Sequence, residues 1–106
     1  MKAVRNLFAS VAAIATIAVS GPATASPELA KAKNCVACHA PSAKLVGPSF
    51  KEIATKYAGD AGAPARLAEK IRKGSQGVWG AVPMPANPQV NDDEANALAR
   101  WILAQH

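Results

Sequence analysis

Two cysteines and a histidine stand close together in this sequence. Cys35 and Cys38 are separated by two residues, and His39 follows directly. This C-x-x-C-H pattern is typical of the site at which a c-type haem is attached. Each thiol can add to one vinyl group of a haem, and the adjacent imidazole can then reach the iron. The pattern therefore predicts one haem c, covalently bound through Cys35 and Cys38, with His39 as an axial ligand.

The same cysteines have alternative uses. In an exported protein they could form a disulfide, although a bridge across two residues closes a very short loop and stabilises little. A thioredoxin-like redox pair would need a βαβ pattern, which the sequence lacks. A metal site built from Cys35, Cys38 and His39 would need another ligand, such as His106 or a carboxylate.

Met84 is the candidate for the second axial ligand. Methionine more often fills gaps in a core, but Met84 lies in a long segment rich in glycine and proline. Pro83 and Pro85 restrict the backbone on both sides of it. A thioether opposite an imidazole raises the reduction potential of a haem. The other histidine, His106, is the last residue, where fraying argues against a fixed ligand.

A carbonyl near His39 is expected to orient the imidazole. A ligating histidine generally donates its second ring N–H to an acceptor of this kind. Gly47 and Pro48 lie in a loop where a carbonyl is free, so we expect the Pro48 oxygen to be that acceptor. The alternative is that Pro48 is an ordinary turn proline.

The first 25 residues have the pattern of a secretory signal peptide. Lys2 and Arg5 precede an apolar stretch over residues 7–20, and Ala23-Thr24-Ala25 forms a small-x-small cleavage pattern. The stretch is shorter than the roughly 20 residues that a membrane-spanning helix needs. We therefore expect cleavage after Ala25, export to the periplasm and no stable membrane association afterwards. An uncleaved anchor is the alternative.

Residues 26–106 then form a single small domain. Two of the twelve basic residues lie in the expected signal peptide, so the domain contains ten basic and seven acidic residues. The sequence lacks the basic and aromatic interleaving of a nucleic-acid interface, and we expect no nucleic-acid partner. A modest positive charge suits acidic protein partners. A domain of this size has a marginal core, which a covalently held haem would enlarge.

The pattern of caps, prolines and apolar residues predicts an all-α domain. Four short helices are expected. The first begins at Ser26 and runs into the C-x-x-C-H segment, with Leu29 as its core contact. The second runs from Ser49 to about Tyr57, the third from near Pro64 to Gly74, and the fourth begins at Asn91 and has an apolar face formed by Ala95, Leu98, Trp101 and Ile102.

Residues 26–106 resemble the small class I bacterial cytochromes c of the cytochrome c-551 type. The resemblance rests on the C-x-x-C-H motif, on Val46-Gly47-Pro48, and on the segments 74–80, 83–87 and 92–101. It implies the class I cytochrome c fold, with four short helices wrapped around one covalently bound haem.

The resemblance also implies roles for individual residues. It implies thioether links at Cys35 and Cys38, axial ligation by His39 and Met84, a Pro48 carbonyl bonded to the imidazole, a Trp79 indole bonded to a haem propionate, and an Asn87 amide that orients the methionine sulfur. Three positions depart from the family: Ala81 and Ala86 fill loop positions that are often proline, and Lys70 stands where relatives often carry an arginine that clamps a propionate. Lysine lacks that fork, so the clamp should be weaker or absent.

The implied function is electron transfer without catalysis. A monohaem c-type cytochrome of this kind would shuttle single electrons in the periplasm between a cytochrome donor and an acceptor such as a nitrite reductase, an oxidase or a peroxidase, and would be a monomer. The alternative is a haem enzyme or gas sensor with an open sixth position. That alternative needs a distal polar group, and the sequence offers none beside Met84.

Overall fold

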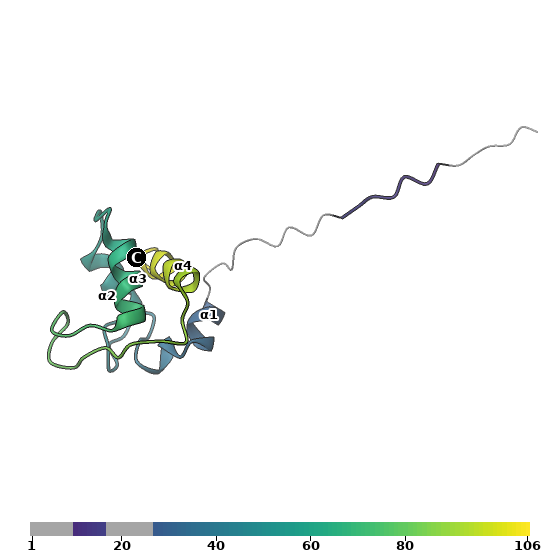
Figure 1. Cartoon of the computed structure of the whole chain (residues 1–106). Coiled ribbons are helices and arrows are strands. Elements are labelled where there is room, and N and C mark those ends of the chain that lie inside the picture. Colours follow the sequence, from purple (N-terminus) through teal and green to yellow (C-terminus); the bar gives the residue numbers. More distant parts are fainter. Residues whose placement is uncertain (1–9, 17–26) are drawn as a thin grey trace, which may run out of the picture.

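The computed structural model describes residues 10–16 and 27–106. The described chain contains four α-helices and one short 3-10 helix: α1 (Pro27–Ala32), η1 (Cys35–Ala37), α2 (Phe50–Lys56), α3 (Ala63–Lys73) and α4 (Asp92–Leu103) (Figure 1). No strand occurs in these ranges, where only two isolated bridges pair backbone segments. The prediction of an all-α domain with four short helices is confirmed.

Of the expected signal peptide, the structure describes only residues 10–16, which are exposed and have no regular secondary structure. The cleavage site after Ala25 and the expected cap residue Ser26 both lie outside the described residues. None of the helices in the described parts of the chain is long and apolar enough to cross a membrane. The signal peptide therefore stays a prediction.

Two helices begin with the same reciprocal cap. At α2, the Glu52 N–H donates to Ser49 Oγ (3.0 Å), and the Ser49 N–H donates to a carboxylate oxygen of Glu52 (3.3 Å). At α4, the Glu94 N–H donates to Asn91 Oδ1 (2.8 Å) and the Asn91 N–H to the Glu94 carboxylate (3.0 Å). Each pair satisfies backbone donors that have no partner inside the helix.

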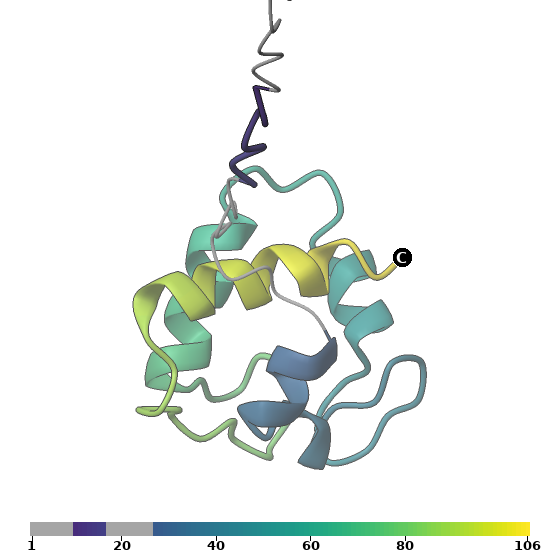
Figure 2. The same cartoon turned by 90° about the vertical axis from the view of Figure 1, so that its right-hand side faces the viewer.

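The core lies where α4 crosses α3 and α2 (Figure 2). Leu98 is fully buried at the centre of α4, between Ala95 and Ala99, which are also 0 % exposed. The two alanines allow the neighbouring helices to approach closely. The other large core residues come from all three helices and from the segment before α4: Phe50, Ile53, Leu67, Ile71, Val90 and Ile102.

The N-terminal helix differs from the expectation. It does not run unbroken into the cysteine motif, because Asn34 adopts a left-handed conformation (φ 66°) and starts the separate turn η1. Asparagine tolerates this conformation better than most residues. The buried residue of α1 is Ala30, at 1 % exposed, whereas Leu29 packs at the edge of the core. The break separates the cysteine motif from α1.

Candidate functional site

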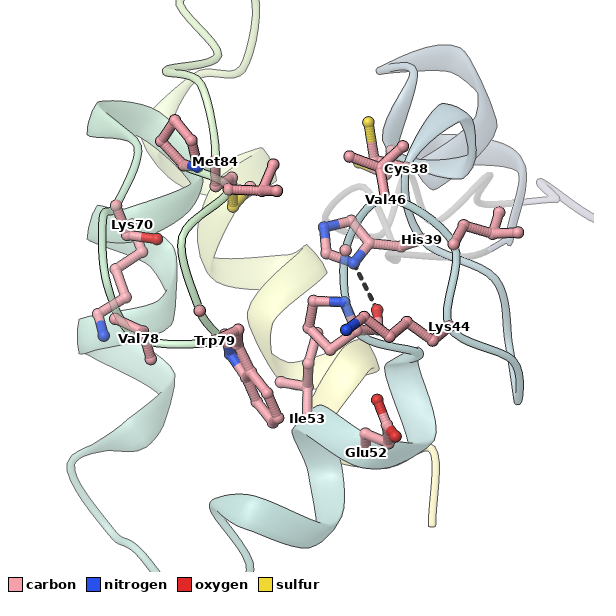
Figure 3. Close-up of a pocket in the computed structure, with 18 of the residues that line it drawn as sticks. Cys38, His39, Lys44, Val46, Glu52, Ile53, Lys70, Val78, Trp79 and Met84 are labelled. Carbon is pink, nitrogen blue, oxygen red and sulfur yellow. Dashed lines mark hydrogen bonds between the residues drawn. The ribbon is translucent and has the colours of Figure 1, made fainter.

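A cavity of about 610 Å³ lies between the cysteine motif, α2, α3 and the segment that precedes α4 (Figure 3). Its inner wall carries apolar side chains of the core, including Phe50, Ile53, Leu67, Ile71 and Ile102. Seven residues to which the sequence analysis gave a possible contact with the haem or its ligands also line it: Cys35, Cys38, His39, Pro48, Lys70, Trp79 and Met84. Residues far apart in the chain thus meet at one apolar cavity.

His39 is held by its neighbours on one wall of the cavity. Its Nδ1 lies 2.7 Å from the Pro48 carbonyl oxygen, so Nδ1 carries the proton and donates it. The other ring nitrogen, Nε2, faces the cavity (Figure 3). The imidazole also stacks on Phe50, with 5.6 Å between ring centroids. The sequence prediction of a carbonyl at Pro48 therefore corresponds to an observed hydrogen bond.

The loop between His39 and α2 is closed by backbone hydrogen bonds that fix the position of Pro48. The Gly47 N–H donates to the Cys38 carbonyl (2.8 Å), and the Phe50 N–H donates to the Ala40 carbonyl (3.0 Å). A Cβ atom on Gly47 would lie 2.6 Å from Cε1 of His39. Glycine is thus needed here because the imidazole lies directly against the backbone.

Both cysteine thiols are free and partly exposed at the edge of the cavity. Burial raises the pKa of the Cys35 thiol, against the opposing effect of a backbone hydrogen bond. A raised pKa keeps the thiol protonated, whereas a redox-active cysteine pair depends on a lowered one. The described residues also contain no strand, so they lack the βαβ unit that a thioredoxin-like cysteine pair would need.

Met84 faces the cavity from the wall opposite His39 (Figure 3). Its backbone pairs with Ser75 through two hydrogen bonds: Met84 N–H to the Ser75 carbonyl (2.9 Å) and Ser75 N–H to the Met84 carbonyl (3.1 Å). Gly74 precedes Ser75 with a φ of +80°, and a Cβ there would lie 2.6 Å from the Met84 carbonyl oxygen. The end of α3 therefore positions Met84, with its side chain packed on the core.

The Asn87 side chain lies against the end of α3 and the backbone next to Met84. It does not line the cavity; its side-chain amide donates to the carbonyls of Ile71 (2.9 Å) and Pro85 (3.3 Å). Its backbone N–H donates to the Arg72 carbonyl (3.1 Å). Asn87 thus ties the segment after Met84 to the last turn of α3. A direct effect on the methionine sulfur stays a prediction.

Trp79 and Lys70 line the cavity, and Lys56 contacts Trp79. The Trp79 side chain lines the cavity (Figure 3). The residue is 38 % exposed to solvent. Lys56 Nζ lies 5.1 Å from the centroid of a Trp79 ring, within the range of a cation–π interaction. Lys70 lines the cavity from the last turn of α3. Its contact with a propionate stays a prediction.

Sequence analysis did not assign Glu52 to the site and did not predict the contact of Lys56 with Trp79. Glu52 was placed correctly in the cap of α2, yet its side chain also lines the cavity (Figure 3). The available signal was its position, four residues after Pro48, at the first turn of the helix that the proximal loop enters. No comparable signal marks Lys56, because its contact with Trp79 joins segments 23 residues apart.

The residues around the cavity fit a haem. An imidazole nitrogen and a thioether sulfur face the same space from opposite walls, and the two thiols lie at one edge. These are the ligand types that hold haem iron in electron-transfer cytochromes. The apolar inner wall suits the porphyrin ring, and the Trp79 indole with Lys44 and Lys70, which also line the cavity, suits its carboxylates.

Comparison with known proteins agrees with this geometry. The sequence profile of the family described as Cytochrome c matches residues 23–105. Cytochrome c-551 of Pseudomonas aeruginosa is 54 % identical over 97 residues, covering 91 % of this chain and 92 % of the relative. Cytochrome c-552 of Nitrosomonas europaea is 52 % identical over 91 residues, covering 86 % of this chain and 88 % of the relative.

Similarity extends to the fold. The crystal structure of wild-type Nitrosomonas europaea cytochrome c552 superposes with a TM-score of 0.75 at 52 % identity and covers 76 % of this chain and all of the solved chain. The site defines a c-type haem protein, and the chain belongs to the cytochrome c family. It has the class I fold and is a small c-type cytochrome of an electron-carrier family, with haem c as its cofactor.

Proposed function

We propose that this protein is a periplasmic monohaem cytochrome that carries single electrons with His39 and Met84 as axial ligands. The observation that carries the proposal is the placement of Nε2 of His39 and the side chain of Met84 on opposite walls of one apolar cavity (Figure 3). The haem, attached through Cys35 and Cys38, supplies the Fe(III)/Fe(II) couple.

The protein holds both ligands in place, so that little needs to move during transfer. On one side, Pro48 and Phe50 orient His39. On the other, the backbone pairing with Ser75 holds Met84. The core wall of the cavity excludes water, which favours a fixed coordination sphere over exchange of ligands.

Several features support electron transfer over catalysis or gas sensing. Met84 fills the position that oxygen or a substrate would need. Its neighbours Val82, Pro83 and Pro85 have no side-chain donor that could stabilise a bound ligand. The relatives named cytochrome c-551 and c-552 match this chain over most of its length.

The proposal includes export and a protein partner. Residues 1–25 act as a signal peptide that is removed after Ala25, and residues 26–106 remain as a monomeric domain in the periplasm. Exposed apolar residues at the cavity rim, Leu45 (50 %), Val46 (57 %) and Val82 (64 %), give a partner a surface close to the haem. A cytochrome donor and a nitrite reductase, oxidase or peroxidase acceptor are the partner classes that we propose.

Absorption spectra of the exported protein test this function. We expect sharp low-spin bands after reduction with dithionite and a weak far-red band in the ferric form from the methionine–iron bond. A high-spin spectrum that changes on addition of CO would contradict the carrier and favour the haem enzyme or gas sensor. Mass spectrometry of the same sample should show haem attached to a chain that begins at Ser26.

A further inference from the structure

A single peptide group links the imidazole of His39 to the cap of α2. The Pro48 carbonyl accepts the hydrogen bond from His39 Nδ1 at 2.7 Å. The N–H of the same peptide group belongs to Ser49, and it donates to Oε2 of Glu52 at 3.3 Å. A carboxylate is thus connected to the proximal histidine through two hydrogen bonds and one amide.

These two hydrogen bonds reinforce each other. An amide whose N–H donates to a carboxylate is polarised, which places more negative charge on its carbonyl oxygen. A stronger acceptor at Pro48 draws the Nδ1 proton of His39 and makes Nε2 a better electron donor. A more basic ligand stabilises ferric over ferrous iron, so the reduction potential falls.

The elements around this peptide hold it in one orientation. Ser49 is 1 % exposed, and its Oγ accepts the Glu52 N–H at 3.0 Å. The next residue, Phe50, is 2 % exposed and stacks on the imidazole. The capping box therefore fixes both the start of α2 and the direction of the Pro48 carbonyl.

We propose that Glu52 is a positioning residue that tunes the axial ligand His39 through the Pro48–Ser49 peptide. The inference rests on the proposed function, since it takes His39 as the ligand of the haem. It gives the cap of α2 a second role besides starting a helix: it sets the donor strength of the imidazole and lowers the reduction potential.

The variants Glu52→Gln and Glu52→Ala separate this effect from charge. Both lose the negative charge, but only glutamine retains an oxygen that can accept from the Ser49 N–H. We expect the Nδ1 proton of His39 in the ferrous protein to resonate further upfield in Glu52→Ala than in Glu52→Gln. We also expect the reduction equilibrium of Glu52→Ala to lie about twofold further toward the ferrous form than that of Glu52→Gln. This corresponds to a reduction potential higher by about 18 mV, since a tenfold shift of a one-electron couple is 59 mV.

The cap of α4 supplies a matched control. Glu94 makes the same reciprocal hydrogen bonds with Asn91, but the Asn91 N–H is joined to the Val90 carbonyl rather than to one that a ligand uses. Glu94→Gln and Glu94→Ala should therefore have equal reduction potentials. If Glu52→Ala does not fold, Glu52→Asp is compared with the unchanged protein instead. Aspartate keeps the negative charge, but its shorter side chain places the carboxylate further from the Ser49 N–H.

The outcomes separate this inference from the proposed function. Equal Nδ1 resonances and equal potentials in Glu52→Gln and Glu52→Ala would overturn the role of Glu52, even where the spectra show a methionine-ligated haem. Missing methionine–iron absorption in the unchanged protein would overturn the proposed function, while the His39 resonance would still report on the Glu52 connection.

Discussion

Ser75 and Met84 exchange both of their backbone hydrogen bonds, with N···O distances of 2.9 and 3.1 Å. This pairing closes the segment between them into a loop that returns to the end of α3. Met84 is thus positioned by a backbone contact with a helix end, and its side chain is free to face the cavity. Because the backbone is fixed, this flexible side chain is restricted in where it can lie, which suits the role of axial ligand that we propose for Met84.

Replacing Met84 should open the sixth position of the iron. In Met84→Ala we expect loss of the far-red ferric band, binding of CO by the ferrous form, and a lower reduction potential, because a thioether favours ferrous iron. Absorption spectra and spectroelectrochemistry measure all three. Val82→Ala, at a residue that is 64 % exposed in the same loop, is the control and should leave the spectrum unchanged. Retention of the far-red band in Met84→Ala would contradict ligation by Met84.

Gly74 and Gly77 form a matched pair for testing how the loop holds Met84. Both have a positive φ, +80° and +73°, but only Gly74 lies against the Met84 backbone. We expect Gly77→Ala to lower the free energy of unfolding by about 1–2 kcal/mol through strain alone. Gly74→Ala should cost at least about 1 kcal/mol more because of the steric overlap. Guanidinium unfolding of the haem-loaded variants measures the difference, and equal losses would contradict the close approach.

Removing the Asn87 side chain should loosen the segment that follows Met84. The amide hydrogen bonds to Ile71 and Pro85 would be lost, and we expect Asn87→Ala to lower the free energy of unfolding by about 1–2 kcal/mol. The far-red band should also disappear at a lower guanidinium concentration than the helical circular dichroism signal. If both signals are lost together at the midpoint of the unchanged protein, Asn87 has no such role.

The acid stability of the protein should depend in part on Glu94. Hydrogen bonds from the Asn91 N–H and from Lys33 hold the pKa of Glu94 below its ordinary value of 4.5. Because the folded state has the lower pKa, ionised Glu94 stabilises the fold above about pH 4.5. This contribution is lost as the pH falls through the lowered value.

Glu94→Gln should therefore be less stable than the unchanged protein at pH 7, and the two should converge as the pH falls through the lowered pKa of Glu94. Thermal unfolding followed by circular dichroism across this pH range measures the effect. Asp93→Asn removes the same charge one residue earlier and serves as the control. A constant difference between Glu94→Gln and the unchanged protein at every pH would contradict the linkage.

Local patterns in the sequence were sufficient to predict the helices. The cap of α2 at Ser49 and Glu52 was predicted from residues three positions apart and is confirmed by both of its hydrogen bonds. The end of α3 at Gly74 and the start of α4 at Asn91 follow in the same way from a glycine and from a polar cap. Such signals depend on residues within one helical turn of each other, so they can be recognised in the sequence without the tertiary structure. The break at Asn34 was missed because most asparagines do not adopt a positive φ.

The sequence by itself also determined the chemistry that the chain can offer: two thiols and an imidazole in one short motif, and a methionine between two prolines. Only the tertiary structure decided how these groups meet. In the folded chain Nε2 of His39 lies opposite Met84, and the Asn87 amide binds the end of α3. Glu52 is connected to the histidine through the Pro48–Ser49 peptide. The physical reason is that these relationships join segments through packing and backbone hydrogen bonds, whose partners depend on how the helices cross.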